Sequence, residues 1–113
     1  MRTIPIPVDT ARLTFTCAKA PRPRLVSQES GVIKTDKDGN TIYETVLMAE
    51  DTFGRIELVK VNTLTDPAIS QGQDVIPRGL LGYVWEIAQN GATRWGISYK
   101  AAEIVPLNGS DRV

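Results

Sequence analysis

The sequence predicts an all-β fold: a small antiparallel barrel of five or six strands, with one longer loop or a short helical turn after the third strand. Apolar and polar residues alternate with a period of two in several segments, which is the pattern of half-buried strands. Turn-forming residues separate these segments at regular spacing, and no segment has the periodicity of a long amphipathic helix. Because closure removes the exposed edges of a flat sheet, we favour a barrel over a sandwich of two sheets.

Length and composition indicate one domain. The chain has 113 residues, of which 42% are hydrophobic and 23% charged, so residues 1–113 suit a single domain of ordinary size. Pro5 and Pro7 lie among aliphatic residues, which predicts an extended arm over residues 1–11. Residues 107–113 are mostly small and polar, and we expect them to form a flexible tail.

The first strand is expected over Arg12–Ala18, where every second residue is apolar. Cys17 belongs to the apolar set, so we expect a buried thiol. Pro21 and Pro23 then predict a bulge or kink, because proline lacks the backbone donor that a strand ladder needs. Pairing can resume over Leu25–Ile33.

Two turns define the next strands. Asp38-Gly39 is typical of a hairpin turn, since glycine tolerates a positive φ, and it leads into a strand over Thr41–Glu50. The Asp51–Gly54 turn then leads into a third strand over Arg55–Val61, which completes a three-stranded meander.

A longer loop, Asn62–Gly72, precedes the last hairpin. Within it, Asp66 can cap a short helical turn over Asp66–Ser70 that begins at a proline. The hairpin itself is expected from Leu80–Ala88 and Thr93–Ile104, joined by Asn90-Gly91, the strongest hairpin signal in the chain.

Four aromatic residues of this hairpin have two interpretations. Tyr83 and Trp85 alternate along one strand, and Trp95 and Tyr99 along the other, each pair sharing its face with aliphatic residues. That arrangement favours positions in the barrel core. The alternative is that these rings stack on nucleic-acid bases.

The inventory of reactive residues argues against an enzyme. The chain has no histidine and one cysteine, which excludes histidine-based triads, histidine metal sites, cysteine zinc clusters and an internal disulfide. The paired carboxylates lie in turns, and the glycines lack phosphate-cradling spacing. We therefore expect no catalysis, cofactor, metal or small-molecule substrate. Without an apolar run of about 20 residues or a signal peptide, we expect a cytoplasmic protein that does not enter a membrane.

The distribution of charge suggests an anionic partner although the net charge is zero. Residues 12–37 carry six basic and two acidic side chains, a local charge of +4 that can track phosphates. Neighbouring prolines hold Arg22 and Arg24 extended, and Phe53 in a turn beside Arg55 suits an exposed stacking platform. The nucleic-acid contacts that these patterns predict are Arg22, Arg24, Lys34, Lys37, Phe53, Arg55, Lys60, Arg94 and Lys100.

The order of features is a kinked first strand, an Asp-Gly hairpin, a third strand, a loop ending in Gly72-Gln73-Asp74-Val75 and a final hairpin. From about Leu13 to Pro106, this order resembles the OB-fold of single-stranded DNA-binding proteins. The segments LVSQESGVIKTDKDGNTIYETVLMAED and GLLGYVWEIAQNGATRWGISYKAAEIVP also resemble small proteins carried on actinobacterial conjugative and integrative elements.

The OB-fold resemblance implies that nucleic acid crosses the middle strands between two gripping loops, which map to Lys19–Gln28 or Lys37–Asn40 and to Ala88–Thr93. The expected function is sequence-tolerant binding of single-stranded DNA, with RNA as an alternative ligand, in replication or transfer of a plasmid or integrative element. The rival is a protein–protein adaptor or assembly subunit on the same barrel that binds no nucleic acid. Zero net charge favours the rival, as does an N-terminal arm that can add a strand to a neighbouring copy and so form a homo-oligomer.

Overall fold

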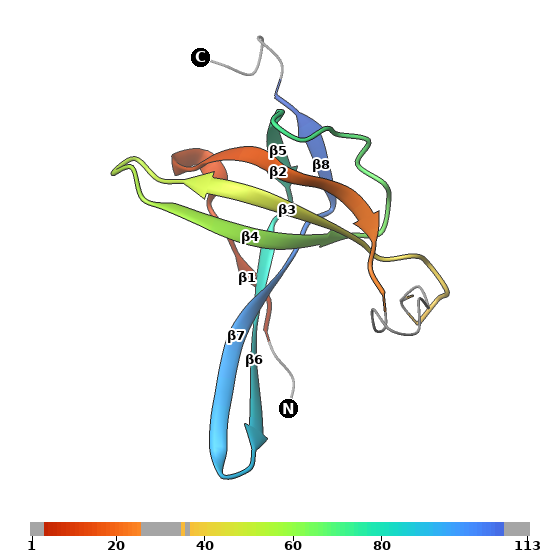
Figure 1. The fold of residues 1–113 in the computed structure, drawn as a ribbon, viewed down its shortest axis with the longest axis vertical. Coiled ribbons are helices and arrows are strands. Elements are labelled where there is room, and N and C mark those ends of the chain that lie inside the picture. Colours follow the sequence, from red (N-terminus) through yellow and green to blue (C-terminus); the bar gives the residue numbers. More distant parts are fainter. Residues whose placement is uncertain (1–3, 26–34, 36, 108–113) are drawn as a thin grey trace.

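The computed structural model describes residues 4–25, 35 and 37–107, and these form an all-β protein, as predicted (Figure 1). The strands are paired in the order β1-β6-β7-β4-β3-β2-β5-β8 within one sheet. No α-helix occurs among the described residues. The elements are β1 (Ile6–Pro7), the 3₁₀ turn η1 (Thr10–Arg12), β2 (Thr14–Pro23), β3 (Tyr43–Glu50), β4 (Ile56–Thr63), β5 (Asp74–Arg78), β6 (Leu81–Gln89), β7 (Ala92–Lys100) and β8 (Glu103–Pro106).

The sheet is mixed and curls into a half-barrel. All its pairs are antiparallel except β4 with β7, which run parallel where Val61 lies beside Tyr99 and Asn62 beside Lys100. The curled part, β2 to β5 with β8, encloses the hydrophobic core. The buried apolar residues are Phe15, Cys17, Leu47, Val61, Ile69, Val75, Leu80, Ala101 and Ile104.

The strands β6 and β7 form a long ribbon that projects from the half-barrel (Figure 1). They pair without interruption from Leu81 opposite Lys100 to Gln89 opposite Ala92. Asn90 and Gly91 join them with φ values of 52° and 78°, the two positive angles that a type I′ turn requires. The predicted Asn-Gly hairpin is therefore confirmed.

The prediction of five or six purely antiparallel strands is wrong. The chain in β5 continues almost directly into β6, and β7 into β8, but each is interrupted by a kink. At the first kink Gly79 has a φ of 65°, and Leu80 turns into the core. At the second, Ala101 is buried and its amide donates to the Asn62 carbonyl. Burial of Ala101 divides the expected strand over Thr93–Ile104 into β7 and β8, whereas β5 is an additional strand that precedes the expected strand over Leu80–Ala88.

The first strand differs from the prediction at both ends. Arg12 belongs to the 3₁₀ turn, which Asp9 caps by accepting from the Ala11 amide, so β2 begins at Thr14. The strand then runs through both prolines to Pro23. Its pairing with β3 shifts register on either side of Lys19, which confirms a bulge in this region.

The predicted helical turn over Asp66–Ser70 is wrong. Ala68 has a φ of 53°, outside the helical range, and its amide donates to Asp66 Oδ1 at 3.0 Å. The aspartate thus closes an Asx turn rather than capping a helix. Ile69 is buried, so the loop contributes to the core.

The N-terminal arm pairs within its own chain. In β1, Ile6 lies opposite Gly82 and Pro7 opposite Leu81 of β6, and the Val8 amide donates to the Leu80 carbonyl at 3.0 Å. At the other end, the Leu107 amide donates to the Asp74 carbonyl, and the rest of the predicted tail lies outside the described residues. The described part of the chain contains no helix of the length and hydropathy that crossing a bilayer requires.

Candidate nucleic-acid interface

The strand register divides the side chains between two faces of the sheet. Residues paired directly across two strands point to the same side. Val61 and its partner Tyr99 face the core, so we call their side the inner face. Asn62 and its partner Lys100 point to the opposite side, which we call the outer face.

Basic residues from β2 and β4 meet on the outer face. Arg22 is paired with Glu44, which in turn lies opposite Asn62, and the Arg22 Nη2 atom is 3.8 Å from Glu44 Oε1. In the neighbouring row, Val46 lies between Lys19 and Lys60. A shallow cavity of about 220 Å³ adds Arg24 to this group, since its lining includes Arg22, Pro23, Arg24, Leu25, Glu44 and Lys60.

The ribbon continues the outer face with two more cations and two aromatic rings. The pairs there join Leu81 to Lys100, Tyr83 to Ser98, Trp85 to Gly96 and Ile87 to Arg94. The Trp85 indole lies directly over Gly96, leaving no room for a Cβ atom at that position. Even so, Trp85 remains 39% exposed.

Two cavities connect the barrel part of the outer face to the ribbon. One of about 320 Å³ lies between β4 and β7 and is lined in part by Arg24, Lys60 and Ser98. The other, of about 180 Å³, includes Asn62, Tyr83 and Lys100 in its lining. The structure therefore brings five predicted contact residues to one face: Arg22, Arg24, Lys60, Arg94 and Lys100.

The outer face has few carboxylates to oppose these cations. In β3 the alternation places Glu44 and Glu50 there. Among the described side chains of β4, β6 and β7, no carboxylate occupies an outer position. The ribbon half of the outer face is therefore basic and aromatic.

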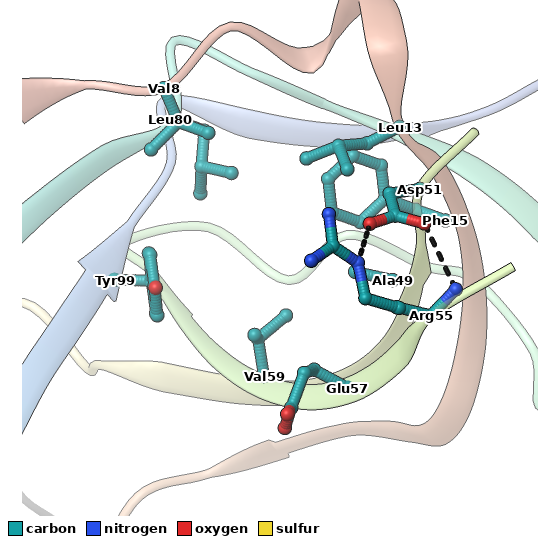
Figure 2. A pocket seen from close by; sticks show the side chains of 10 residues that line it. All are labelled: Val8, Leu13, Phe15, Ala49, Asp51, Arg55, Glu57, Val59, Leu80 and Tyr99. Atoms are coloured by element: carbon teal, nitrogen blue, oxygen red, sulfur yellow. Dashed lines mark hydrogen bonds and ion pairs between the residues drawn. The ribbon is translucent and has the colours of Figure 1, made fainter. Parts of the chain in front are cut away.

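Phe53 and Arg55 lie apart from this cluster, in the turn at the other end of β3 and β4. Phe53 is 82% exposed and its ring centroid is 5.4 Å from the Arg55 guanidinium carbon, so the predicted exposed pair is present. Asp51, however, binds the guanidinium through a contact of 2.6 Å from Nε to Oδ2 (Figure 2). Arg55 is thus partly neutralised and separate from the outer-face cations.

The Asp51 carboxylate organises that turn. Its Oδ1 accepts from the Phe53 amide at 2.8 Å and from the Arg55 amide at 2.9 Å. These bonds hold the pKa of Asp51 below its ordinary value. The largest lowering comes from the hydrogen bond of the Arg55 amide, and smaller ones come from the Arg55 side chain and the Phe53 amide. The folded turn therefore stabilises the charged form of Asp51.

Two predicted contacts remain to be placed. Lys37 lies in an exposed turn in which Gly39 has a φ of 84°, as expected for the Asp-Gly signal, and an antiparallel bridge joins Thr35 to Thr41. No cavity on the outer face includes Lys37 in its lining. Lys34 lies outside the described residues.

The inner face has a different character. A cavity of about 380 Å³ opens into the half-barrel beside Asp51 and Arg55, over a floor that includes Leu13, Phe15 and Leu80 (Figure 2). On the ribbon, the inner positions include Val84 opposite Ile97 and Glu86 opposite Trp95. The inner face is thus mainly apolar in both its barrel and ribbon parts, with charged side chains at the cavity and at Glu86.

The prediction that both tryptophans fill the barrel is wrong. Trp95 is 69% exposed, because the ribbon projects beyond the barrel and no second layer from the described part of the chain covers it. Tyr99 packs against the core at the base of the ribbon, whereas Tyr83 is half-buried on the outer face, so only Tyr99 approaches the predicted position.

Sequence reasoning missed one basic residue and the inner cavity. Lys19 shares a row with Lys60, but the bulge in β2 hides this relation from a simple alternation. The cavity combines residues of β2, β3, β4 and β7 with residues of the connecting segments, and it has no local signal. Comparison with protein-family models, with curated proteins and with solved structures finds no match to this chain.

Proposed function

We propose that this protein is a non-catalytic single-stranded DNA-binding protein built on an OB-like barrel. The observation that carries the proposal is the outer face, where Lys60, Lys100 and Arg94 share one side of the sheet with the exposed Trp85 and the half-buried Tyr83. A basic groove with stacking platforms is the usual means of holding a single strand, because every base has a π-face and every nucleotide a phosphate.

The pattern of strand pairing supports an OB-like fold. If β5 with β6 counts as one kinked strand and β7 with β8 as another, the sheet reduces to five strands and the two-residue β1. The first strand, β2, then pairs with the second and the fourth, while the third and the fifth pair in parallel. The OB-fold is a five-stranded, partly open Greek-key barrel with this connectivity, and the hairpin of its last two strands corresponds to the ribbon of β6 and β7.

In the proposed mode of binding, cationic side chains contact the phosphates and aromatic rings stack on the bases. Lys60 and Lys100 contact phosphates along the β4–β7 groove, while Trp85 and Tyr83 on the ribbon stack on bases. No residue in this set forms a base-specific bidentate fork, so the binding tolerates sequence variation. A role in replication or transfer of a mobile element, in the cytoplasm, follows from the sequence resemblance alone.

The alternative function is that of an assembly subunit or adaptor without nucleic-acid binding. The exposed apolar residues of the inner ribbon face favour it, since such patches commonly mark protein contacts. The N-terminal arm no longer supports it, because β1 pairs with β6 of its own chain.

Fluorescence anisotropy of a labelled oligo(dT) of about 30 nucleotides, long enough for several OB-type sites, tests the proposal. We expect salt-dependent binding that duplex DNA competes for poorly. The double variant Lys60→Ala with Lys100→Ala should bind more weakly. The slope of log K against the logarithm of the salt concentration should become shallower by roughly 0.7 for each lost phosphate contact.

The matched control is Arg78→Ala, which also removes a cation, but one that lies beside Glu103 on the β5–β8 side of the barrel. It should leave affinity unchanged at constant salt. Absence of oligo(dT) binding by the unaltered chain at low salt would reject the proposal in favour of the adaptor. Equal losses of affinity in the control and the double variant would show that the groove between β4 and β7 is not the binding site.

A further inference from the structure

The ribbon has an unpaired backbone edge. In the sheet order, β7 lies between β6 and β4, but its described register with β4 covers only Tyr99 and Lys100. Between Ala92 and Ser98, therefore, one side of β7 has no strand beside it among the described residues. A two-stranded hairpin is marginal in water, and a third strand with apolar contacts is the usual remedy.

The hairpin register identifies which backbone groups point to that edge. Gln89 and Ala92 flank the two-residue turn and form a hydrogen-bonded pair, after which bonded and non-bonded pairs alternate. Thr93, Trp95 and Ile97 are the non-bonded positions, so their N–H and C=O groups point away from β6. Tyr99 continues this series, and it is where β4 does pair.

We propose that a second copy of this chain pairs with β7 through this edge, forming a two-fold dimer. When the two-fold axis passes beside Trp95, the two β7 strands run antiparallel, and Trp95 of one copy lies directly opposite Trp95 of the other. Thr93 of each copy then faces Ile97 of the other. All of the outward backbone groups in the free segment thus find partners in a self-complementary arrangement.

The side chains suit a second copy of the same chain. In this register Arg94 lies opposite Gly96 of the other copy, so the two arginines are not directly opposed. Aromatic and β-branched side chains occupy the facing inner positions, and such cross-strand pairs are favourable. Chains with 13 basic and 13 acidic residues also carry no net charge to oppose self-association.

The exposed apolar surface of the inner ribbon face contributes part of a dimer interface. Three large apolar side chains that are 40–69% exposed occupy inner positions of β6 and β7, and they provide roughly 300 Å². A standard interface buries about 800 Å² on each partner, and the strand ladder and its flanking side chains would add to this area. The three residues are Val84, Trp95 and Ile97.

The dimer would enlarge the binding surface, a consequence that rests on the proposed function. Edge pairing keeps the outer faces of both ribbons on the same side of one four-stranded sheet. The Arg94 and Trp85 side chains of the two copies would then form one continuous platform for a single strand of nucleic acid.

Sedimentation equilibrium of the full chain tests the dimer, over about 1 to 100 µM. We expect a mass near twice the 12.4 kDa of one chain at the higher concentrations. Thr93→Pro removes one outward donor without touching the β6 ladder, and it should raise the dimer dissociation constant by at least about tenfold. Thr93→Ala keeps that donor and loses only a cross-strand side-chain contact, so it should raise the constant clearly less than Thr93→Pro does.

Trp95→Lys is a second, independent variant, because it opposes two like charges at the two-fold axis and should give monomers. Far-UV circular dichroism and thermal unfolding verify that both variants fold. These measurements are made at protein concentrations below the dimer dissociation constant. A monomer at every concentration of the unaltered chain, or dimers that persist in both variants, would overturn the proposal. Oligo(dT) binding is measured separately, so a dimer that binds no DNA would reject only the proposed function.

Discussion

The half-barrel and the ribbon have the same alternating sequence pattern but opposite environments. Leu47 in β3 has no exposed surface, whereas the apolar positions of the ribbon, such as Ile87 and Trp95, face solvent. The difference arises because curled strands supply a second layer to one another, while the ribbon projects beyond the layer that could cover it. Alternation therefore predicts a strand, but it does not show whether the apolar face of that strand has a partner.

The same comparison separates the two faces of the ribbon. Its outer side carries Arg94 and Lys100 with Trp85, whereas its inner side carries Trp95 and Ile97 with one carboxylate, Glu86. One side suits an anionic polymer and the other suits a protein surface. Each of the following experiments asks whether the two regions, or the two faces, differ as the structure indicates.

The largest effect is expected in the barrel core. Leu47→Ala removes a fully buried side chain and should lower the free energy of unfolding by about 2–5 kcal/mol, because it creates a cavity as well as losing buried surface. Chemical denaturation measures this change. Ile87→Ala on the outer ribbon is the matched control and should change it by less than about 0.5 kcal/mol. Similar losses in both variants would show that the ribbon is part of the core.

The two tryptophans distinguish the faces of the ribbon. The chain contains only Trp85 and Trp95, so Trp95→Phe and Trp85→Phe each leave a single reporter. Oligo(dT) should quench the emission of Trp85, which lies on the outer face, through stacking worth about 1–3 kcal/mol. It should leave Trp95 emission unchanged at a fixed protein concentration. Quenching of Trp95 alone would reverse the assignment of the faces.

Glycine turns test whether the ribbon and barrel unfold separately. Gly91→Ala places a Cβ at a φ of 78°, which costs roughly 1–2 kcal/mol. Native-state hydrogen exchange should show faster exchange for ribbon amides and unchanged exchange for the amide of Leu47. Gly54→Ala introduces the same strain at a φ of 83° in the β3–β4 turn, and it should instead affect the barrel. Equal effects of the two variants on all amides would indicate one cooperative unit.

The smallest effect is expected for Asp51, whose pKa is lowered in the folded state, first by the Arg55 amide. Its contribution to stability is complete above the unfolded pKa of about 4 and is lost as the pH falls through the lower folded value. Asp51→Asn should therefore reduce stability at neutral pH and flatten its dependence on pH below 4. Thermal unfolding between pH 2 and 7 measures this dependence. If the variant loses stability at low pH in the same way as the unaltered chain, Asp51 does not have the assigned role.

The local chemistry of turns and strands was predictable from neighbouring residues. Asn90-Gly91 and Asp38-Gly39 form turns with positive φ angles, Phe53 is exposed in its turn, and Cys17 is buried in an apolar alternation. These features depend on backbone sterics and on a period of two, both of which act over a few residues. The all-β class followed from the same short-range rules.

The candidate site was predictable in composition but not in arrangement. Arg22, Arg24, Lys60, Arg94 and Lys100 share one face only because β4 and β7 pair in parallel over two residues. Phe53 and Arg55 are separated from them by the length of β3. No local pattern encodes which strands become neighbours, because pairing is settled by long-range contacts.

The sequence by itself determined the all-β class, the Asp38-Gly39 and Asn90-Gly91 turns and the absence of histidine chemistry, since propensity, periodicity and inventory are properties of the chain. Tertiary structure decided the kinks at Leu80 and Ala101, the docking of β1 on β6, and the projection of the ribbon. Burial in a curled sheet depends on which surfaces meet, and that outcome places Leu47 in the core but leaves Trp95 in solvent.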